Sequence, residues 1–306
     1  MTKSQAWLYA LRLRTLPLAL SSIIAGSSIA YADVKGGFHW LVFALCILTT
    51  LFLQILSNLA NDYGDSEKGT DNEDRIGPKR AVQAGLLSFS EIKQGIIICA
   101  LLALVSGIAL IYEGLKGLDI TYLLFFFVLG LGAIGAAIKY TVGDNAYGYK
   151  GLGDIFVFLF FGIVGVCGSH YILAHKIHYS VFLPACTIGA FAAGVLNLNN
   201  MRDHIGDEKA GKTTLVVRIG LVRALQYHRF LILAGFAASI VFVLLNFTST
   251  MQFLFIITVP LFRRHLVAVR RVNEPAEFDP LLPQLAIGTF IFSILFALGM
   301  IIGSVG

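Results

Sequence analysis

The chain has 306 residues, of which 57% are hydrophobic and only 13% are charged, and its mean hydropathy is +0.79. Typical soluble domains carry about 25% charged residues, so this composition excludes an ordinary soluble protein and indicates one that lies in a bilayer. The formal net charge of +5 then bears on orientation in the membrane, and we expect no nucleic-acid partner.

Apolar runs long enough to cross a bilayer as helices recur along nearly the whole chain. Arginines 263, 264, 270 and 271 shorten the apolar core of the eighth run, which is the least regular. The sequence predicts an all-α integral membrane protein, with residues 1–306 forming a single domain. The nine expected spans are residues 15–32, 39–61, 91–112, 119–139, 154–174, 180–200, 225–246, 250–270 and 284–304.

Lys and Arg residues are distributed unevenly between the two ends of these spans. If the N-terminus is cytoplasmic, all but three of the 23 fall on the cytoplasmic side, and the exceptions are Lys35, Lys116 and Lys176. This positive-inside bias predicts a cytoplasmic N-terminus. Because the number of spans is odd, the C-terminus is expected on the other side.

A first acidic stretch, NLANDYGDSEKGTDNEDRIGPKR, begins at Asn58 near the end of the second span and reaches Arg80. Carboxylates crowded at a membrane edge repel one another and lose hydration, so they normally need a cation. The acidic residues of this stretch are Asp62, Asp65, Glu67, Asp71, Glu73 and Asp74.

A second stretch, NNMRDHIGDEKAGK, follows the sixth span and has the same order of residue types. Asn199 precedes Asp203 by four residues, as Asn58 precedes Asp62. Because the two stretches are four spans apart, they emerge on the same side of the membrane. We therefore expect Asp-rich cytoplasmic loops at about 58–90 and 199–224 that share one site.

Carboxylate and amide oxygens at a helix end suit hard cations, and Mg²⁺ in particular combines a few carboxylates with substrate phosphates. Asp203 and Asp207 share one face if their helix continues through them. Lys and Arg residues lie among the acids, which favours an ion-bridged polyphosphate over a simple cation store. Two alternatives remain, a solvated acidic loop and a divalent-ion transporter, although nearly uncharged spans disfavour transport.

Taken together, these motifs resemble the UbiA superfamily of intramembrane prenyltransferases. The resemblance rests on NDYGD with the preceding Asn58, on GPKR, on KYT and YGYKGLGD, on NNMRDHIGDEKAGKTTL and on the opening RLRTLPLAL. It covers nearly the whole chain and is closest to the branch that prenylates 1,4-dihydroxy-2-naphthoate. It implies nine helices around a central cavity that opens laterally to lipid, in the bacterial cytoplasmic membrane.

The resemblance also implies which residues form the site. Asn58, Asp62, Asp65, Asp203 and Asp207 are the expected catalytic and metal-binding residues, holding the diphosphate of an isoprenoid donor through Mg²⁺, expected as two ions. The expected substrate-binding residues are Arg14, Lys79, Arg80, Lys139, Tyr140, Asp154, Arg202 and Lys209.

Two of these assignments leave alternatives open. Gly69 stands where the superfamily often has a further Asp, so Asp71 remains an undecided ligand. Asp154 either helps to orient the acceptor or begins the fifth span as a helix cap.

The reaction implied is the Mg²⁺-dependent transfer of a polyprenyl group from polyprenyl diphosphate to 1,4-dihydroxy-2-naphthoate. Loss of CO₂ would then give a demethylmenaquinone. The alternative is a related enzyme with another acceptor, namely 4-hydroxybenzoate, homogentisate, haem or a chlorophyllide. The sequence leaves the prenyl chain length and the oligomeric state open.

Overall fold

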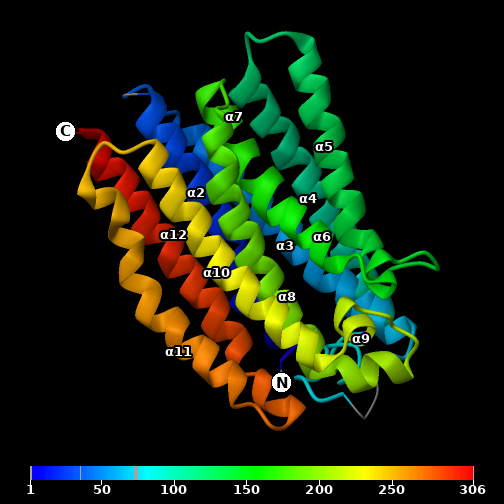
Figure 1. Cartoon of the computed structure of the whole chain (residues 1–306). Coiled ribbons are helices and arrows are strands. Elements are labelled where there is room, and N and C mark those ends of the chain that lie inside the picture. The colour runs from blue at the N-terminus through cyan, green and yellow to red at the C-terminus, as the bar shows by residue number, and fades with distance from the viewer. Residues whose placement is uncertain (1, 35, 72–74, 306) are drawn as a thin grey trace.

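The structure is a computed structural model that describes residues 2–34, 36–71 and 75–305. Within these ranges the regular secondary structure is entirely helical, without a strand, and includes nine segments long and apolar enough to cross a membrane. The segments run side by side as one bundle (Figure 1). The predicted fold class is thereby confirmed, while Lys35, Glu73 and Asp74 of the sequence patterns lie outside the described residues.

Several of the segments combine more than one helical element. Two short helices, η2 (Tyr147–Lys150) and α9 (Leu215–Ile219), lie between segments. The nine segments are α1 (Lys3–Leu11) with η1 (Leu13–Thr15) and α2 (Leu16–Val34); α3 (Trp40–Glu67); α4 (Phe89–Leu115); α5 (Ile120–Lys139); α6 (Gly153–Val157) with η3 (Phe158–Cys167) and α7 (Gly168–Ala174); η4 (Tyr179–Val181) with α8 (Phe182–Lys209); α10 (Leu221–Leu245); η5 (Thr250–Thr258) with α11 (Val259–Arg270); and η6 (Pro275–Phe278) with α12 (Leu281–Val305).

The helices α3 and α8 extend beyond their predicted ends, to Glu67 and Lys209. The two Asp motifs therefore lie on the last helical turns, and their expected placement in loops was wrong. Each helix stops where a glycine adopts the left-handed conformation, at Gly69 (φ 69°) and Gly211 (φ 73°). The polar residues before these glycines continue the helix because none of them is a proline.

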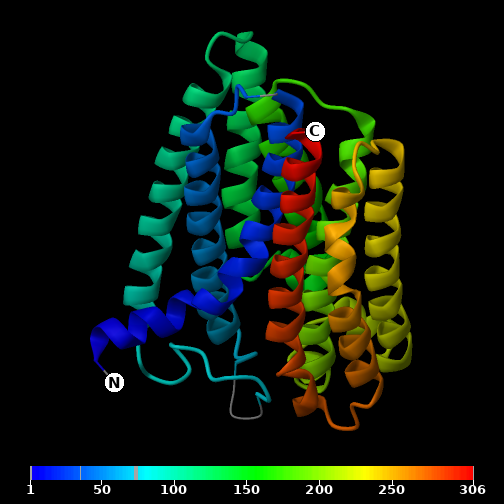
Figure 2. The same cartoon turned by 90° about the vertical axis from the view of Figure 1, so that its left-hand side faces the viewer.

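The first segment is bent near its start. Arg12 adopts the left-handed conformation with φ 50°, which separates α1 from η1 and α2. As a result α1 runs obliquely across one end of the bundle before α2 enters it (Figure 2). The helix α12 finishes at the opposite end, as an odd number of crossings requires.

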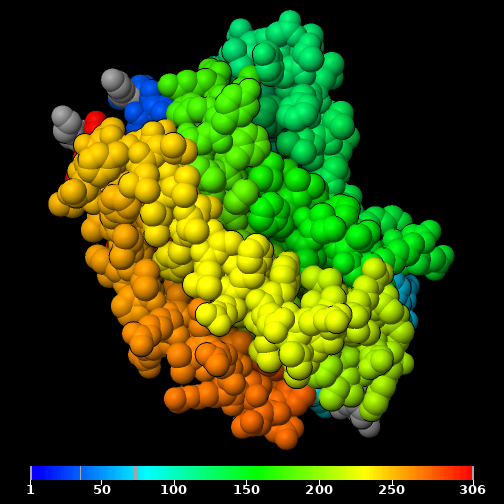
Figure 3. Space-filling model, in the orientation of Figure 1, coloured from blue at the N-terminus to red at the C-terminus, as the bar shows by residue number. Residues whose placement is uncertain are grey.

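The two halves of the bundle pack differently. Around the fully buried Phe191, the rings of Phe262 and Phe292 lie with centroids 4.8 Å and 5.3 Å away, which joins α8 to α11 and α12. On the face shown in Figure 3, α10 and α11 cover this half. The first half, α1 to α7, packs around a cavity instead.

Glycine allows η3 to approach its neighbours closely. An added Cβ on Gly26 would lie 2.2 Å from the carbonyl oxygen of Val166, and one on Gly162 would lie 2.5 Å from that of Ala185. These contacts leave no room for a side chain, as is common between membrane helices. In α5, by contrast, a Cβ on Gly132 would meet no atom within 4 Å.

We predict that Gly26→Ala destabilises the protein, because its new methyl group overlaps the backbone of η3, at a cost of about 1–3 kcal/mol. The matched control Gly132→Ala adds the same methyl group in open space and should be neutral or slightly stabilising. The thermal unfolding midpoint in detergent measures both. Equal midpoints for the two variants would contradict the close contact between α2 and η3.

Candidate active site

The ends of α3 and α8 have matching geometry. After Gly69 the Thr70 N–H donates to the carbonyl of Asp65 (3.0 Å), and after Gly211 the Lys212 N–H donates to that of Asp207 (2.8 Å). The turn at Gly211 brings the Lys212 side chain back towards the end of α8. Its Nζ lies 3.7 Å from Asp65 Oδ1 and 3.6 Å from Asp207 Oδ1, so the two acidic stretches meet at this lysine.

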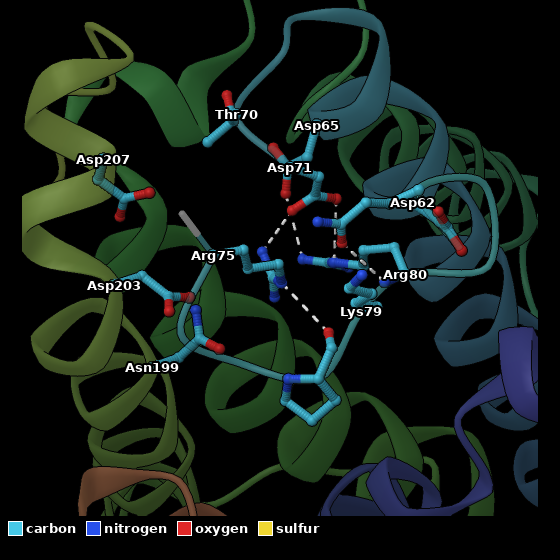
Figure 4. A network of polar contacts seen from close by, with 12 residues as sticks. Asp62, Asp65, Thr70, Asp71, Arg75, Lys79, Arg80, Asn199, Asp203 and Asp207 are labelled. Atoms are coloured by element: carbon cyan, nitrogen blue, oxygen red, sulfur yellow. Dashed lines mark hydrogen bonds and ion pairs between the residues drawn. The ribbon is translucent and has the colours of Figure 1, made fainter. Parts of the chain in front are cut away.

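Arginines from the loop after α3 compensate the first group of carboxylates. Arg80 lies 3.2 Å from Asp65 Oδ2 through one Nη atom and 3.2 Å from Asp71 Oδ2 through Nε. Arg75 pairs with Asp71 and extends between the carboxylates of α3 and those of α8 (Figure 4). The Tyr149 hydroxyl donates to Asp65 Oδ1 at 2.8 Å.

Arg202 organises the second group. Its Nε and one Nη donate to the two carboxylate oxygens of Asp203 at 2.8 Å and 2.7 Å, and the guanidinium also pairs with Asp279 ahead of α12. A Cβ on Gly77 would lie 2.6 Å from Arg202 Cζ, so the loop backbone rests directly on the guanidinium. This one buried arginine therefore connects α8, the 75–80 loop and the start of α12.

Asp62 and Asn58 fix the surrounding segments in place. The carboxylate of Asp62 accepts hydrogen bonds from the N–H groups of Ala81 (2.9 Å) and Val82 (3.3 Å). Asn58 Nδ2 donates to the carbonyl of Leu11 at 2.9 Å. Both side chains are buried and line the cavity, four residues apart on one face of α3.

The carboxylates are short of favourable partners. Asp207 Oδ2 is buried and forms no hydrogen bond within residues 2–34, 36–71 and 75–305, whereas Asp71 Oδ2 has Arg80 Nε at 3.2 Å. Burial raises the pKa of Asp71 to about 7, against the opposing effect of Arg75. For Lys212, burial lowers the pKa, but Asp65 and Asp207 outweigh it and the net shift is upward. An oxygen-rich acidic cluster of this kind fits Mg²⁺.

The site opens into a cavity of about 700 Å³ within the bundle. Its lining on α3 extends from Asp65 back to Cys46, which is roughly 28 Å along the helix axis and nearly the thickness of the bilayer core. The lining is polar beside the Asp motifs and apolar beyond them. Apolar lining residues include Leu18, Leu53, Leu110, Phe126, Phe156, Phe160, Phe161 and Ile172.

The substrate-binding residues predicted from the sequence fall into two groups. Lys139 and Lys209 are exposed and do not line the cavity. Asp154 is buried outside the cavity lining, in the first turn of α6, and has the hydroxyl of Tyr227 as a partner. Leu152 occupies the N-cap position of α6, so the alternative of Asp154 as a helix cap was wrong. The predicted residues that do line the cavity are Arg14, Lys79, Arg80, Tyr140 and Arg202.

Several residues of the site were missing from the predicted set. Arg75 and Lys212 lie inside the two motif stretches, and the left-handed Gly211 was the signal that Lys212, rather than Lys209, turns back into the site. Arg12 and Tyr149 lie in RLRTLPLAL and YGYKGLGD, two motifs of the resemblance, and Asp279 lies in none of them. The sequence did not show that these three residues reach the cluster, because each comes from a distant segment.

Comparison with known proteins places this arrangement in a family. A family model described as the UbiA prenyltransferase family matches residues 19–279. The chain belongs to this family. The resemblance inferred from the motifs is thereby confirmed.

Two relatives of this UbiA-family chain match almost end to end. A 1,4-dihydroxy-2-naphthoate octaprenyltransferase of Haemophilus influenzae is 44% identical over 98% of this chain and 97% of its own length. The Escherichia coli protein of the same name is 42% identical over 98% and 96%. The fold is similar to that of a UbiA homologue from Archaeoglobus fulgidus bound to GPP and Mg²⁺, with a TM-score of 0.65 at 18% identity, covering 97% of this chain and 99% of that one.

We predict that Lys212→Met lowers the stability of the ligand-free protein by about 3 kcal/mol, because two buried carboxylates lose the cation they share. Lys209→Met is the matched control, since Lys209 is exposed only three residues away. Thermal unfolding in detergent, without divalent ions, compares the two variants. Indistinguishable midpoints would mean that Lys212 does not hold the two motifs together.

Proposed function

We propose that the protein transfers a polyprenyl group from polyprenyl diphosphate to 1,4-dihydroxy-2-naphthoate, with loss of CO₂, giving demethylmenaquinone in its reduced form. One observation carries this proposal: a buried cluster of carboxylates and cations stands at the polar end of a long apolar cavity. Polar chemistry and room for an isoprenoid are thus combined in one site. The names of the two near-full-length relatives support the choice of acceptor.

We propose that the five predicted ligands bind the diphosphate through Mg²⁺. Asp65 and Asp207 face the shared Lys212, Asp203 lies beside them, and Asn58 and Asp62 line the adjoining cavity wall. When bound, Mg²⁺ supplies positive charge that stabilises the departing diphosphate. We propose two ions, which the carboxylates of α3 and α8 would hold together. Support for Mg²⁺ comes from the buried Asp207 Oδ2, which forms no hydrogen bond within the described residues, and from the bound state of the archaeal homologue.

The protein's own cations complete the electrostatic environment. Arg75, Arg80 and Lys212 already lie among the carboxylates, so their N–H groups are oriented before a substrate arrives. Charge-assisted hydrogen bonds from such groups to diphosphate oxygens stabilise charge that develops as the C–O bond breaks. The electron pair of that bond leaves with the diphosphate, and an allylic cation remains.

The apolar cavity keeps water away from this cation, which water would otherwise capture. A carbon of the electron-rich dihydroxynaphthoate ring then forms a bond to the allylic carbon. Loss of the carboxylate as CO₂ returns an electron pair to the ring, so the product is a quinol and no oxidant is needed. We propose Arg14 and Tyr140, which line the polar part of the cavity, as the residues that orient the acceptor.

The isoprenoid tail would enter sideways from the lipid. The helix α5 lines the cavity through Gly130 and Ala133, and an added Cβ on Gly130 would meet no atom within 4 Å. Small residues there leave a smooth apolar surface for a chain to lie on. We accordingly propose this face of α5 as a wall of the lateral opening.

The proposed reaction predicts that membranes containing the protein, Mg²⁺ and a long-chain prenyl diphosphate convert 1,4-dihydroxy-2-naphthoate to a product lighter by CO₂ than the simple adduct. Mass spectrometry of the lipid extract measures this mass. Excess EDTA should abolish the product, and Asp207→Asn should lower the rate at least about 100-fold, the scale on which electrostatic stabilisation of a leaving group is lost.

Parallel reactions with 4-hydroxybenzoate and homogentisate serve as acceptor controls, and Glu208→Gln, an exposed neighbour of Asp207, serves as the matched variant. A product formed only with another acceptor would agree with the role of the two Asp motifs but would reject 1,4-dihydroxy-2-naphthoate as the acceptor. Full turnover in EDTA would reject the role of Mg²⁺. Absence of any product from folded protein would reject the prenyltransferase reaction and favour ion transport.

We further propose that the protein lies in the bacterial cytoplasmic membrane with its N-terminus and the Asp motifs in the cytoplasm. A reporter that works only outside the cytoplasm should therefore be active when it is fused to the C-terminus. The nine crossings found within the described residues put the two ends of the chain on opposite sides of the membrane. A reporter fused to the N-terminus is the control. A C-terminal reporter that works in the cytoplasm would contradict the nine crossings.

A further inference from the structure

A second polar cluster lies at the end of the bundle opposite the candidate active site. Asp33 near the end of α2 accepts a hydrogen bond from His170 Nε2 of α7 at 2.9 Å and one from His178 Nε2 at 2.7 Å, both at the same oxygen, Oδ2. Figure 1 shows these ends of α2 and α7 far from α9 and the loops around the Asp motifs. The cluster is therefore separate from the site of prenyl transfer.

The three side chains converge as metal ligands do. One ligand atom from each of Asp33, His170 and His178 lies within 4.8 Å of the others. Zinc–nitrogen and zinc–oxygen bonds of about 2.0–2.2 Å place the ligand atoms around one ion roughly 3.3 Å apart. The two short separations, 2.9 Å and 2.7 Å, would need to open by only a few tenths of an ångström.

The burial of the three side chains and the segments from which they come are also compatible with a bound metal ion. The His170 side chain is fully buried, Asp33 is 18% exposed and His178 is 39% exposed, so the cluster has a rigid inner side and an outer side that solutes can reach. The ligands come from α2, from α7 and from the loop before η4. His175, close in sequence, is engaged elsewhere, since its Nε2 lies 2.6 Å from the carbonyl oxygen of Gly114.

We propose that Asp33, His170 and His178 form a binding site for a divalent transition metal such as Zn²⁺. Two imidazoles and one carboxylate favour such ions over Mg²⁺, which prefers oxygen ligands. Three protein ligands leave a coordination position for water. The protein would thus carry two metal sites of different chemistry, an oxygen site for Mg²⁺ and this nitrogen-rich site on the other side of the membrane.

The surroundings of His170 set the strength of binding. With a metal on Nε2 the ring proton must lie on Nδ1, and this buried atom has no hydrogen-bond partner in the part of the chain that the structure describes. Metal-binding histidines usually donate this second N–H to an acceptor, and losing that donation weakens binding by about 10–100-fold. Binding is therefore expected to be reversible and weaker than in structural zinc sites.

The ion would stabilise the packing of helices in the bundle and would take no part in the prenyl transfer reaction. Ser169 and Ile172, on either side of His170 in α7, line the cavity. By tying α7 to α2 and to the start of the α8 segment, a metal would hold these helices together beside that part of the cavity lining. Its binding should raise stability and leave the basal rate of prenyl transfer unchanged.

The test uses the full-length protein, purified in detergent, stripped with EDTA and returned to excess Mg²⁺ so that the Asp-rich site is filled. Titration with Zn²⁺ should show one equivalent bound and a higher unfolding midpoint, and Co²⁺ should give the absorption of a nitrogen-ligated ion. His178→Ala should weaken Zn²⁺ affinity at least 10-fold and remove the stabilisation. Because His178 is partly exposed, this variant is expected to fold.

Two further variants make the result specific. His39→Ala removes an exposed histidine at the start of α3, five residues after the end of α2, and should bind Zn²⁺ as the unaltered protein does. His178→Gln retains a hydrogen-bond donor towards Asp33 but is a poor ligand, so it should keep the basal midpoint and lose the Zn²⁺ response. Equal Zn²⁺ affinity in His178→Ala and the unaltered protein would overturn the proposal. Absence of Zn²⁺ binding to the unaltered protein would overturn it too, leaving the cluster as a hydrogen-bonded brace.

Discussion

Lys212 holds its ammonium group between Asp65 and Asp207 in a place from which water is largely excluded. Burying an unpaired charge costs several kcal/mol, so these two carboxylates are tolerated because a cation accompanies them. The cations come from three different segments, and their geometry therefore fixes how α3, α8 and the 75–80 loop stand relative to one another. The structure of the site is, in this sense, a consequence of its charge balance.

For the proposed reaction, the same balance suits a polyphosphate. A diphosphate and the divalent cations that accompany it add charges of both signs, and so could enter without leaving the cluster strongly charged. The carboxylates would then exchange a lysine or arginine partner for a metal ion, while the cations would exchange a carboxylate for a phosphate oxygen. Burial supplies the low dielectric that makes these interactions strong, and the membrane helices supply the burial.

Hydropathy and motif spacing were sufficient for the architecture, because a bilayer demands long apolar helices and two matched acidic stretches stand out against them. Other features depend on the folded arrangement. Arg12 reaches the cluster only because the chain bends at its own left-handed residue, and Asp279 only because α12 begins beside α8. The choice between Lys209 and Lys212 turned on where α8 ends, and helix ends are the least certain part of any sequence-based prediction. Nothing in the sequence relates His170 and His178 to Asp33, because the three residues come from separate segments.

The two halves of the bundle are stabilised by different interactions. Aromatic residues around Phe191 fill the half built from α8 and α10 to α12, which gives a rigid wall. The other half is held at its two ends, by charges at the Asp motifs and by the cluster around Asp33, and is left open between them. A cavity nearly as long as the bilayer is thick would collapse without such fixed ends, because apolar side chains gain contacts by filling empty space. Between these two ends the small residues Gly130 and Ala133 of α5 line the cavity, and this is the wall that we propose as the lateral opening.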